Sequence, residues 1–257
     1  MIIDAYTFCW NEQVKLEYFL RLWSPLCRRV VVFDNGSTDD SQKVASKYEN
    51  VVWDVGTVGD KFDDYVKQKV SNKCWVDASG DADLVYIGDI DEILYHPSGL
   101  KSYYEKKIKE DYNVFKPYAY DMVNVNLPTH PGQIYDHRGF KIGHRIYDKS
   151  MKRVGKDPCS YDKCSVFSPK AIDKVWFSRG FHKSVFTGGN IKVCYEPDYK
   201  LLHYKYIGRE RFVEYNLSAG KRINVEHGIG STYQLTTENE LYRKFDRRLR
   251  LPSKQII

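Results

Sequence analysis

The chain has 257 residues and a mass of 30.2 kDa, with 42% hydrophobic, 29% charged and 15% aromatic residues. This composition excludes a disordered chain, which lacks aromatic residues, and a fibrous one, which needs a short repeat. No stretch approaches the roughly 18 apolar residues of a membrane-spanning helix. The first ten residues show no basic leader before an apolar run, so we predict no secretory signal and a cytoplasmic location.

The net charge of +6 is concentrated at the C-terminal end of the chain. Residues 243–257 contain six basic side chains and one acidic one, so the rest of the chain is almost neutral. Nucleic-acid-binding proteins carry a basic stripe through the folded domain, and we therefore expect no nucleic-acid partner. The pattern favours a solvated tail, and the alternative is peripheral contact with an anionic membrane surface.

The first hundred residues alternate short β-branched runs with helical patterns. Strands are predicted at residues 2–8, 29–33, 51–55 and 84–87, and helices at 14–23, 41–48 and 60–70. Strand–helix alternation of this kind predicts an α/β fold with a mostly parallel central sheet flanked by helices. In such sheets, ligands bind at the carboxyl ends of the strands.

The second half of the chain is less regular. Residues 113–120 and 191–206 are predicted to be extended. Residues 118–143 are rich in Pro, Gly, His and Asn and are predicted to form loops. Helices are predicted at 208–222 and at 238–249, the latter opened by a capping box of Thr237 and Glu240. We expect one domain over 1–222, with a nucleotide half (1–97) and a loop-rich acceptor half (98–222). A helix and basic tail follow at 223–257.

Polar clusters follow three of the predicted strands, at residues 7–12, 34–39 and 88–92. Taken alone, residues 34–39 have a sequence that is typical of a turn, and residues 88–92 are compatible with an Asx-type turn. We expect all three clusters to lie at one edge of the sheet, however. Carboxylates that lie close together there destabilise the folded state unless a cation or ligand donors neutralise them.

The pair Asp89 and Asp91 is the most informative of these features. Alternation along an extended segment places both carboxylates on one side. Hard oxygen ligands beside a site for phosphates suit Mg²⁺ or Mn²⁺. A lone D-x-D is a weak signal, but here it ends an apolar strand about 55 residues after D-N-G-S-T-D.

The motifs together resemble glycosyltransferases of family 2, which have the Rossmann-like GT-A fold. The resemblance is carried by Asn-Glu at 11–12, D-N-G-S-T-D at 34–39 and D-I-D-E at 89–92. Residues 9–12 (C-W-N-E) and 202–205 (L-H-Y-K) are similar to those of a compact, single-domain branch. The resemblance covers about residues 2–222. The absence of a Q-x-x-R-W motif argues against polymer synthesis and for transfer of a single sugar.

The resemblance implies an enzyme that moves one sugar, with inversion, from a nucleotide diphosphate sugar to a hydroxyl of a glycan or glycolipid. A UDP-sugar is the expected donor, and Mn²⁺ or Mg²⁺ the expected cofactor. Asp89 is the implied ribose contact, and Asp91 and His203 are the implied metal ligands. The remaining implied donor-binding residues are Thr7, Phe8, Glu12, Asp34, Asn35 and Gly36.

The catalytic base must lie beyond the donor sugar, so we expect it in the second half of the chain. Asp121 is the preferred candidate, because the resemblance implies a carboxylate base. His182 is the competitor, because an unperturbed histidine already titrates near neutrality. Two alternative functions stay open, namely a non-catalytic sugar- or nucleotide-binding module and a nucleotidyltransferase of the same fold. The latter should begin with a Gly-rich phosphate loop, and residues 7–12 contain no glycine.

Overall fold

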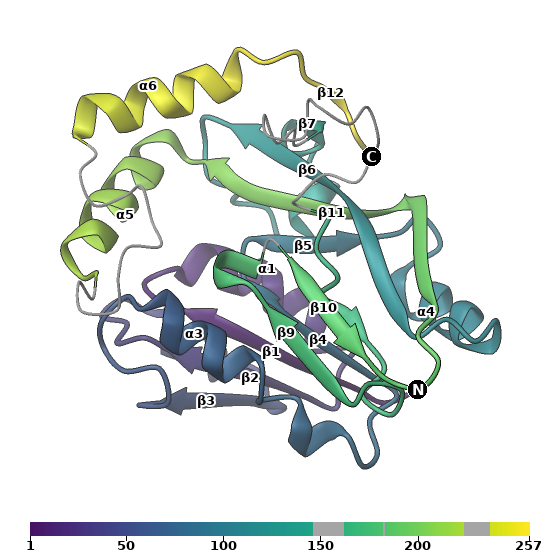
Figure 1. The fold of residues 1–257 in the computed structure, drawn as a ribbon. Coiled ribbons are helices and arrows are strands. Elements are labelled where there is room, and N and C mark those ends of the chain that lie inside the picture. The colour runs from purple at the N-terminus through teal and green to yellow at the C-terminus, as the bar shows by residue number, and fades with distance from the viewer. Residues whose placement is uncertain (146–161, 182, 224–236) are drawn as a thin grey trace.

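A computed structural model describes residues 1–145, 162–181, 183–223 and 237–257. The central sheet has ten strands in the order β12-β7-β6-β8-β4-β1-β2-β3, with β11 pairing to both β6 and β5, and β9 and β10 form a separate hairpin (Figure 1). The α-helices in this part of the chain are α1 (Gln13–Trp23), α2 (Ser41–Ala45), α3 (Asp64–Ser71), α4 (Leu100–Lys109), α5 (Arg209–Lys221) and α6 (Glu238–Leu249). The strands are β1 (Ile3–Cys9), β2 (Arg29–Asp34), β3 (Val51–Val55), β4 (Leu84–Asp89), β5 (Glu92–Tyr95), β6 (Val114–Asn124), β7 (Ile142–Arg145), β8 (Val166–Phe167), β9 (Lys174–Phe177), β10 (Ser184–Thr187), β11 (Val193–Ile207) and β12 (Lys254–Gln255).

The predicted α/β class and its parallel sheet are confirmed. Strands β3, β2, β1 and β4 pair in parallel, and β11 pairs in parallel with β6. The pairings of β5, β7, β8 and β12 are antiparallel. Because β1 lies between β2 and β4, the loops that follow these three strands meet at one edge of the sheet.

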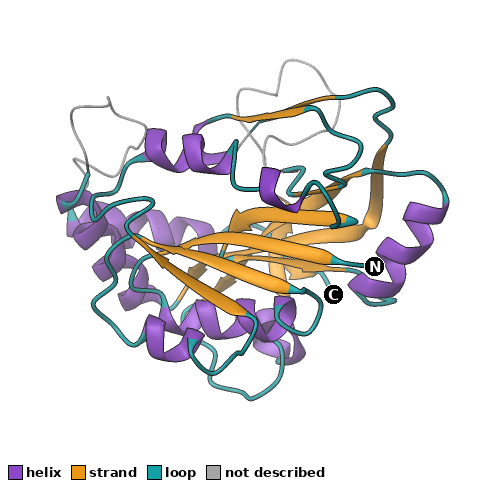
Figure 2. Cartoon of the chain, turned by 90° about the horizontal axis from the view of Figure 1, so that it is seen from below, coloured by secondary structure: helices purple, strands orange, loops and turns teal. Residues whose placement is uncertain are grey.

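Alternation along the strands divides the core between the two faces of the sheet. In β4, Leu84 and Tyr86 pack into one cluster with α1 and α4, whereas Val85 and Ile87 pack into a second cluster with the β9–β10 hairpin. The strands cross the middle of the molecule with helices around them (Figure 2). Burial on both faces explains why these strands read as continuous apolar runs. Among the described residues, no helix is long and apolar enough to cross a membrane.

The structure differs from the sequence-based expectation mainly at element boundaries and in the second half. Helix α3 begins later than predicted, because the side chain of Asp63 accepts hydrogen bonds from the backbone N–H groups of Tyr65 and Val66. Strand β6 continues to Asn124, into residues that were predicted as loop. Helix α4 was not predicted. The short strands β5, β7 and β8 were not predicted either, because the strands that they pair with are distant in sequence.

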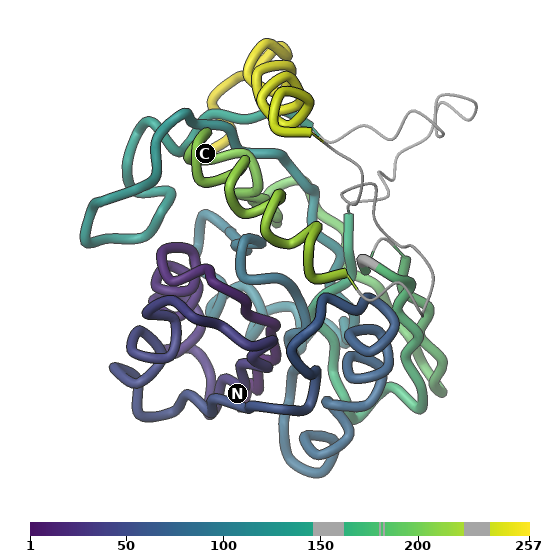
Figure 3. Tube along the Cα trace, turned by 90° about the vertical axis from the view of Figure 1, so that its left-hand side faces the viewer, coloured from purple at the N-terminus to yellow at the C-terminus, as the bar shows by residue number. Residues whose placement is uncertain are grey.

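The basic C-terminal end is packed against the domain, contrary to the expectation of a solvated tail. Helix α6 has the predicted bounds and capping box, and its Leu241 and Phe245 are buried beside Val123 and Phe212. Strand β12 then pairs with β7 at the end of the main sheet. Figure 3 shows α6 above α5, with α5 between α6 and the N-terminal half. The apolar face of α6 therefore belongs to the core of the domain.

We predict that Phe245→Ala destabilises the whole domain. The ring of Phe245 is fully buried, and removing such a ring costs about 3–5 kcal/mol. Urea unfolding followed by circular dichroism should show a lower midpoint in one transition. The control is Arg247→Ala, which changes an exposed side chain of the same helix and should shift the unfolding free energy by less than about 0.5 kcal/mol. Equal stability of Phe245→Ala and the wild type would contradict the docking of α6.

Candidate active site

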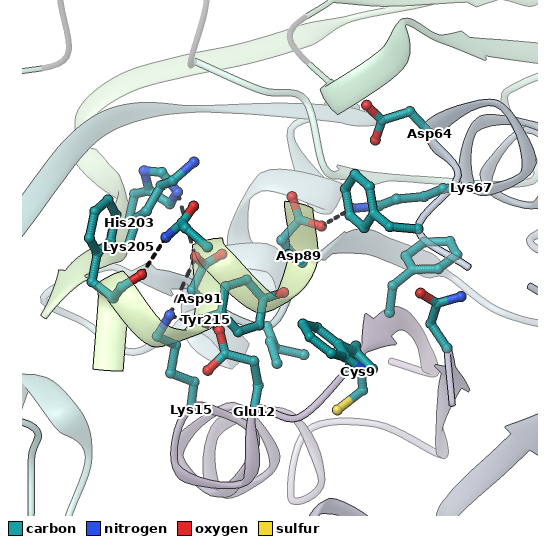
Figure 4. A pocket seen from close by; sticks show the side chains of 18 of the residues that line it. Cys9, Glu12, Lys15, Asp64, Lys67, Asp89, Asp91, His203, Lys205 and Tyr215 are labelled. Atoms are coloured by element: carbon teal, nitrogen blue, oxygen red, sulfur yellow. Dashed lines mark hydrogen bonds and ion pairs between the residues drawn. The ribbon is translucent and has the colours of Figure 1, made fainter. Parts of the chain in front are cut away.

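A cavity of about 460 Å³ opens where the carboxyl ends of β1 and β4 meet β11, α5 and α6 (Figure 4). Its wall is rich in charge, with more cations than carboxylates. The cationic lining residues are Lys15, Lys67, Lys163, Arg179, Lys205, Arg211, Lys244 and Arg248, and the carboxylates are Glu12, Asp63, Asp64, Asp89 and Asp91. Eight cations against five carboxylates make this cavity suitable for an anionic ligand.

The loop after β1 is tied to the loop after β2. Asn11 has a left-handed backbone (φ 47°), a conformation that asparagine tolerates better than most residues. Its side-chain oxygen accepts hydrogen bonds from the backbone N–H groups of Thr38 (2.6 Å) and Asp39 (3.2 Å). The backbone N–H of Asn11 in turn donates to the hydroxyl of Ser37 (3.0 Å). The two predicted polar clusters therefore form one connected rim.

Within the D-N-G-S-T-D segment, only Asn35 lines the cavity. The carboxylate of Asp34 is buried and accepts from the backbone N–H of Ser37 at 3.0 and 3.2 Å, so it holds the turn. Gly36 supplies the left-handed backbone of that turn (φ 75°). The amide of Asn35 donates to the carbonyl oxygens of Gly59 (2.7 Å) and Lys61.

The D-x-D pair lies at the turn between β4 and β5, and hydrogen bonds from neighbouring strands hold this turn in place. The hydroxyl of Tyr86 donates to the carbonyl oxygens of Asp89 and Glu92, both at 3.3 Å. Gly88 permits this approach, because a Cβ at that position would lie 2.3 Å from the Tyr86 hydroxyl oxygen. The backbone N–H of Tyr204 on β11 donates to the carbonyl oxygen of Asp91 (2.7 Å). The positions of both aspartates are thus set by the sheet.

Two lysines neutralise Asp89. Lys67 of α3 forms an ion pair with one carboxylate oxygen, and the Nζ of Lys163 lies 3.7 Å from the other. Burial works against the charged form of Asp89, but these two ammonium groups outweigh it and hold the pKa of this carboxyl well below its usual value. Lys163 also pairs with Glu92, whose pKa is raised by burial. Asp89 therefore carries a full negative charge at neutral pH.

Asp91 faces a histidine that comes from the second half of the chain. The Nε2 of His203 lies 3.8 Å from the Oδ2 of Asp91, and its Nδ1 lies 2.8 Å from the Oδ1 of Asp121. Register explains this arrangement, because His203 on β11 lies opposite Glu92 on β5 and opposite Asp121 on β6. Burial disfavours the charged imidazolium, but the carboxylates of Asp91 and Asp121 outweigh it and raise the pKa of His203.

Asp121 is buried behind His203 and does not line the cavity. Its second oxygen faces the Nη1 of Arg248 at 3.4 Å and the Nε2 of His144 at 3.7 Å. Burial alone would raise the pKa of Asp121, but the hydrogen bond with His203 and the charges of His203, Arg248 and His144 together outweigh burial, and the pKa of Asp121 is lowered. An acceptor hydroxyl in the cavity would meet His203 before Asp121. The structure thus places the carboxylate of Asp121 behind His203, and its role as the base stays a prediction.

Glu12 is the carboxylate that lines the cavity beside β1. Its carboxylate is buried and lies 3.0 Å from the Nζ of Lys15, which also lies 3.9 Å from Asp91. Burial raises the pKa of Glu12, and Lys15 opposes that rise. Thr7, in contrast, is fully buried, and its hydroxyl donates to the carbonyl oxygen of Gly88 at 2.9 Å. It joins β1 to β4 and does not reach the cavity.

The structure thus gathers most of the predicted site residues and separates others from them. Those that line the cavity are Phe8, Glu12, Asn35, Asp89, Asp91 and His203. Those that support it from outside are Thr7, Asp34, Gly36 and Asp121. His182 lies outside the described residues, and its assignment stays a prediction.

Sequence reasoning missed the cations of the cavity. Lys67 and Lys163 are surface-type residues with no motif around them, and only the fold brings them to Asp89. Arg211 and Tyr215 are different, since both line the cavity from α5 at a spacing of four. That spacing places two side chains on one helix face and was visible in the sequence.

Comparison with solved structures gives partial matches at low identity. Glucosyl-3-phosphoglycerate synthase from Mycobacterium tuberculosis in complex with Mn²⁺, UDP and glucosyl-3-phosphoglycerate is 19% identical, with a TM-score of 0.31 over 46% of this chain and 44% of that chain. The same enzyme with Mn²⁺, UDP-glucose and phosphoglyceric acid is 21% identical, with a TM-score of 0.32 over 46% of this chain and 43% of that chain. A mycobacterial protein is 19% identical, with a TM-score of 0.33 over 48% of this chain and 43% of that chain. This chain thus spans less than half the length of each of these structures. No protein-family model and no curated protein sequence matches it.

We predict that the side chain of His203 titrates above the value of about 6.5 that is usual for histidine. Asp121→Asn should lower the titration midpoint of His203, because the neutral amide no longer stabilises the imidazolium. NMR titration of the histidine Cε1–H signals, assigned with His203→Gln, measures both midpoints. The control Asp77→Asn changes an exposed carboxylate outside the cavity and should leave the midpoint unchanged.

The raised pKa of His203 also makes the free energy of unfolding depend on pH. A raised pKa in the folded state means that His203 contributes stability below about pH 6.5, which is lost as the pH rises through the folded-state pKa. The free energy of unfolding of the wild type, relative to His203→Gln, should therefore decline over that interval. A midpoint of His203 below 6.5 in the wild type would contradict the assigned environment.

Proposed function

We propose that the chain is a metal-dependent glycosyltransferase that moves one sugar from a nucleotide diphosphate sugar to a hydroxyl acceptor. One observation carries the proposal. Asp91, from the D-x-D turn, and His203, from the L-H-Y-K segment, face each other at 3.8 Å in a cationic cavity at the carboxyl ends of parallel strands. The two motifs are 112 residues apart, and a purely structural role for either would not require this juxtaposition.

The walls suit a nucleotide diphosphate. Trp10 and Tyr215 form an aromatic pair with ring centroids 5.3 Å apart, and both line the cavity with Phe8. Aromatic faces of this kind hold a base or the apolar face of a sugar. The excess of cations over carboxylates in the lining would balance the diphosphate charge. We propose a UDP-sugar as the donor, on the resemblance of the sequence.

A divalent cation fits the donor set at this point. A carboxylate oxygen and an imidazole nitrogen 3.8 Å apart can both reach one ion, and both suit Mn²⁺ or Mg²⁺. Among the described residues, no group of three His, Cys, Asp or Glu side chains could hold a metal ion. Asp91 and His203 would therefore share the ion with diphosphate oxygens, as is usual for Mg²⁺. The ion would stabilise the charge that develops on the leaving diphosphate.

The chain's own residues would orient the reactants. Asp121 holds the Nδ1 of His203 and so directs its Nε2 toward Asp91, which makes Asp121 a positioning residue. Asp89, held by two lysines, is the proposed ribose contact. We propose His182, the competing candidate from the sequence, as the base for the acceptor hydroxyl, and the single displacement would invert the anomeric carbon. The proposed acceptor is a glycan or glycolipid.

Two other functions compete with this proposal. A sugar- or nucleotide-binding module without activity would bind the donor and release no nucleoside diphosphate. A nucleotidyltransferase would form a nucleotide sugar from a nucleoside triphosphate and a sugar phosphate. The loop after β1 contains no glycine to receive a triphosphate, which favours the glycosyltransferase.

We predict that Asp91→Asn abolishes the metal dependence of nucleotide binding. Calorimetric titration with UDP, GDP and dTDP, each with Mn²⁺ and with EDTA, should show tighter binding with Mn²⁺ for at least one nucleotide. In Asp91→Asn the values with Mn²⁺ and EDTA should become equal, because a neutral amide is a poor ligand for a hard cation. The control Asp77→Asn should behave as the wild type.

Hydrolysis of the matching nucleotide sugar is the second readout, and Asp91→Asn should reduce its rate by at least about 100-fold. Binding without hydrolysis or transfer in the wild type would favour the non-catalytic module. Metal-independent binding of all three nucleotides in the wild type would remove the metal from the proposal.

A further inference from the structure

The β9–β10 hairpin forms a small sheet of its own, beside α3 and apart from the main sheet (Figure 1). Val175 lies opposite Phe186, and Phe177 lies opposite Ser184. The side chains of Val175, Phe177 and Phe186 pack into the same core cluster as Val85 and Ile87 of β4. Because side chains alternate along a strand, the residues between these apolar ones point away from the core.

The outward side of the hairpin, here called the hairpin face, is built from three pairs of residues that lie opposite each other. These residues are Lys174 and Thr187, Trp176 and Val185, and Ser178 and Lys183. Trp176 and Val185, the middle pair, are 48% and 54% exposed. Both lysines are exposed as well. The hairpin face is therefore an apolar pair with a cation at each end.

The surroundings of this pair are basic. Residues 174–187 contain Lys174, Arg179 and Lys183 and no Asp or Glu. Lys69 of the neighbouring α3 is exposed. Asp173 is the nearest acidic residue in the sequence, and it precedes β9 and lines a second cavity. The hairpin face thus has the charge that complements an anionic surface.

Hydrogen bonds to α3 fix the orientation of the hairpin. The backbone N–H of Phe177 donates to the side-chain oxygen of Asn72 (2.8 Å), and the side-chain amide of Gln68 donates to the carbonyl oxygen of Phe177 (2.5 Å). Trp176 cannot turn inward, because its neighbours Val175 and Phe177 already occupy the buried side. The exposure of the Trp176 ring is therefore set by the register of the hairpin.

We propose that the hairpin face docks on the surface of an anionic lipid bilayer. Trp176 and Val185 would lie at the level of the headgroups, and Lys174 and Lys183 would meet their negative charge. Tryptophan is enriched where membrane meets water, and basic side chains beside it are attracted to anionic lipids. A stable protein partner or a second copy of the chain would need about 20–30 residues on each side, far more than the hairpin face offers.

The turn of the same hairpin reaches the candidate active site. Arg179 lines the cavity, and the ring of Phe181 lies 6.3 Å from that of Phe8, which also lines it. A bilayer against the hairpin would therefore lie close to this wall of the cavity. The docking does not depend on the proposed function, although it would suit the proposed glycolipid acceptor.

The first test is flotation of the full chain with vesicles of phosphatidylcholine, alone or mixed with an equal part of phosphatidylglycerol. The wild type should bind the anionic vesicles only, and added salt should weaken the binding. The double variant Lys174→Gln, Lys183→Gln should bind about tenfold more weakly or less. The control double variant Lys43→Gln, Lys101→Gln has the same net charge and should bind as the wild type does. Its two lysines are exposed on α2 and α4, which pack against the other face of the sheet.

The second test locates the tryptophan. Trp176→Ser should weaken binding to the anionic vesicles about fivefold or more, because apolar surface no longer leaves water. Val52→Ser removes a side chain that is 49% exposed on β3 and should have no effect. Vesicles with brominated acyl chains should quench the tryptophan emission of the wild type, and Trp176→Phe should remove most of that quenching.

Several outcomes would overturn the inference. They are a wild type that does not bind anionic vesicles, equal binding by the hairpin and control double variants, and quenching that persists in Trp176→Phe. A dimer of the wild type that Trp176→Ser dissociates would overturn it too, since the hairpin face would then bind a second copy. Binding of UDP with Mn²⁺ should be equal in the wild type and the hairpin variants. A wild type that binds the vesicles by this face but no nucleotide would support the docking and refute the proposed function.

Discussion

The pairing of β11 with both β5 and β6 is the constraint on which the site depends. It places His203 opposite Glu92 on one side and opposite Asp121 on the other. A shift of one residue would turn the side chain of His203 to the other face of the sheet. The register is therefore what brings an imidazole to within 3.8 Å of Asp91. The D-x-D turn is fixed in the same way, by the hydroxyl of Tyr86 beneath it.

Charge balance is the second condition that shapes the cavity. Five carboxylates in a partly buried space would repel one another, and lysines from α1, from α3 and from the segment before β8 reduce this repulsion. Lys67 and Lys163 neutralise Asp89, while Lys15 lies between Glu12 and Asp91. The pairing leaves the cavity with an excess of cations. An anionic ligand with a bound divalent cation would suit this mixture better than a neutral sugar alone.

The C-terminal helix links stability to the site. Its apolar face closes a small core with α5 and the end of β11, and its other face reaches the cavity. Fixing α6 through Arg209 and Asp246 thus also fixes Lys244 and Arg248. A segment that looks like a charged tail by composition is for this reason part of the fold. Its buried side chains, Leu241 and Phe245, and the pairing of Arg209 with Asp246 together set the orientation of the helix.

Local patterns in the sequence predicted the regular half of the fold and the motifs of the site. Apolar runs with helical patterns between them predicted β1 to β4 and the edge where their loops meet, because periodicity is a local property. The capping box predicted the start of α6 for the same reason. Contacts between residues far apart in the sequence, in contrast, depend on how the strands and helices pack. Lys67, Lys163 and Asp121 acquired their roles through contacts over 22, 74 and 82 residues, as their numbers beside Asp89 and His203 show. Such contacts are set by strand register and helix docking, and no pattern within a short window encodes them.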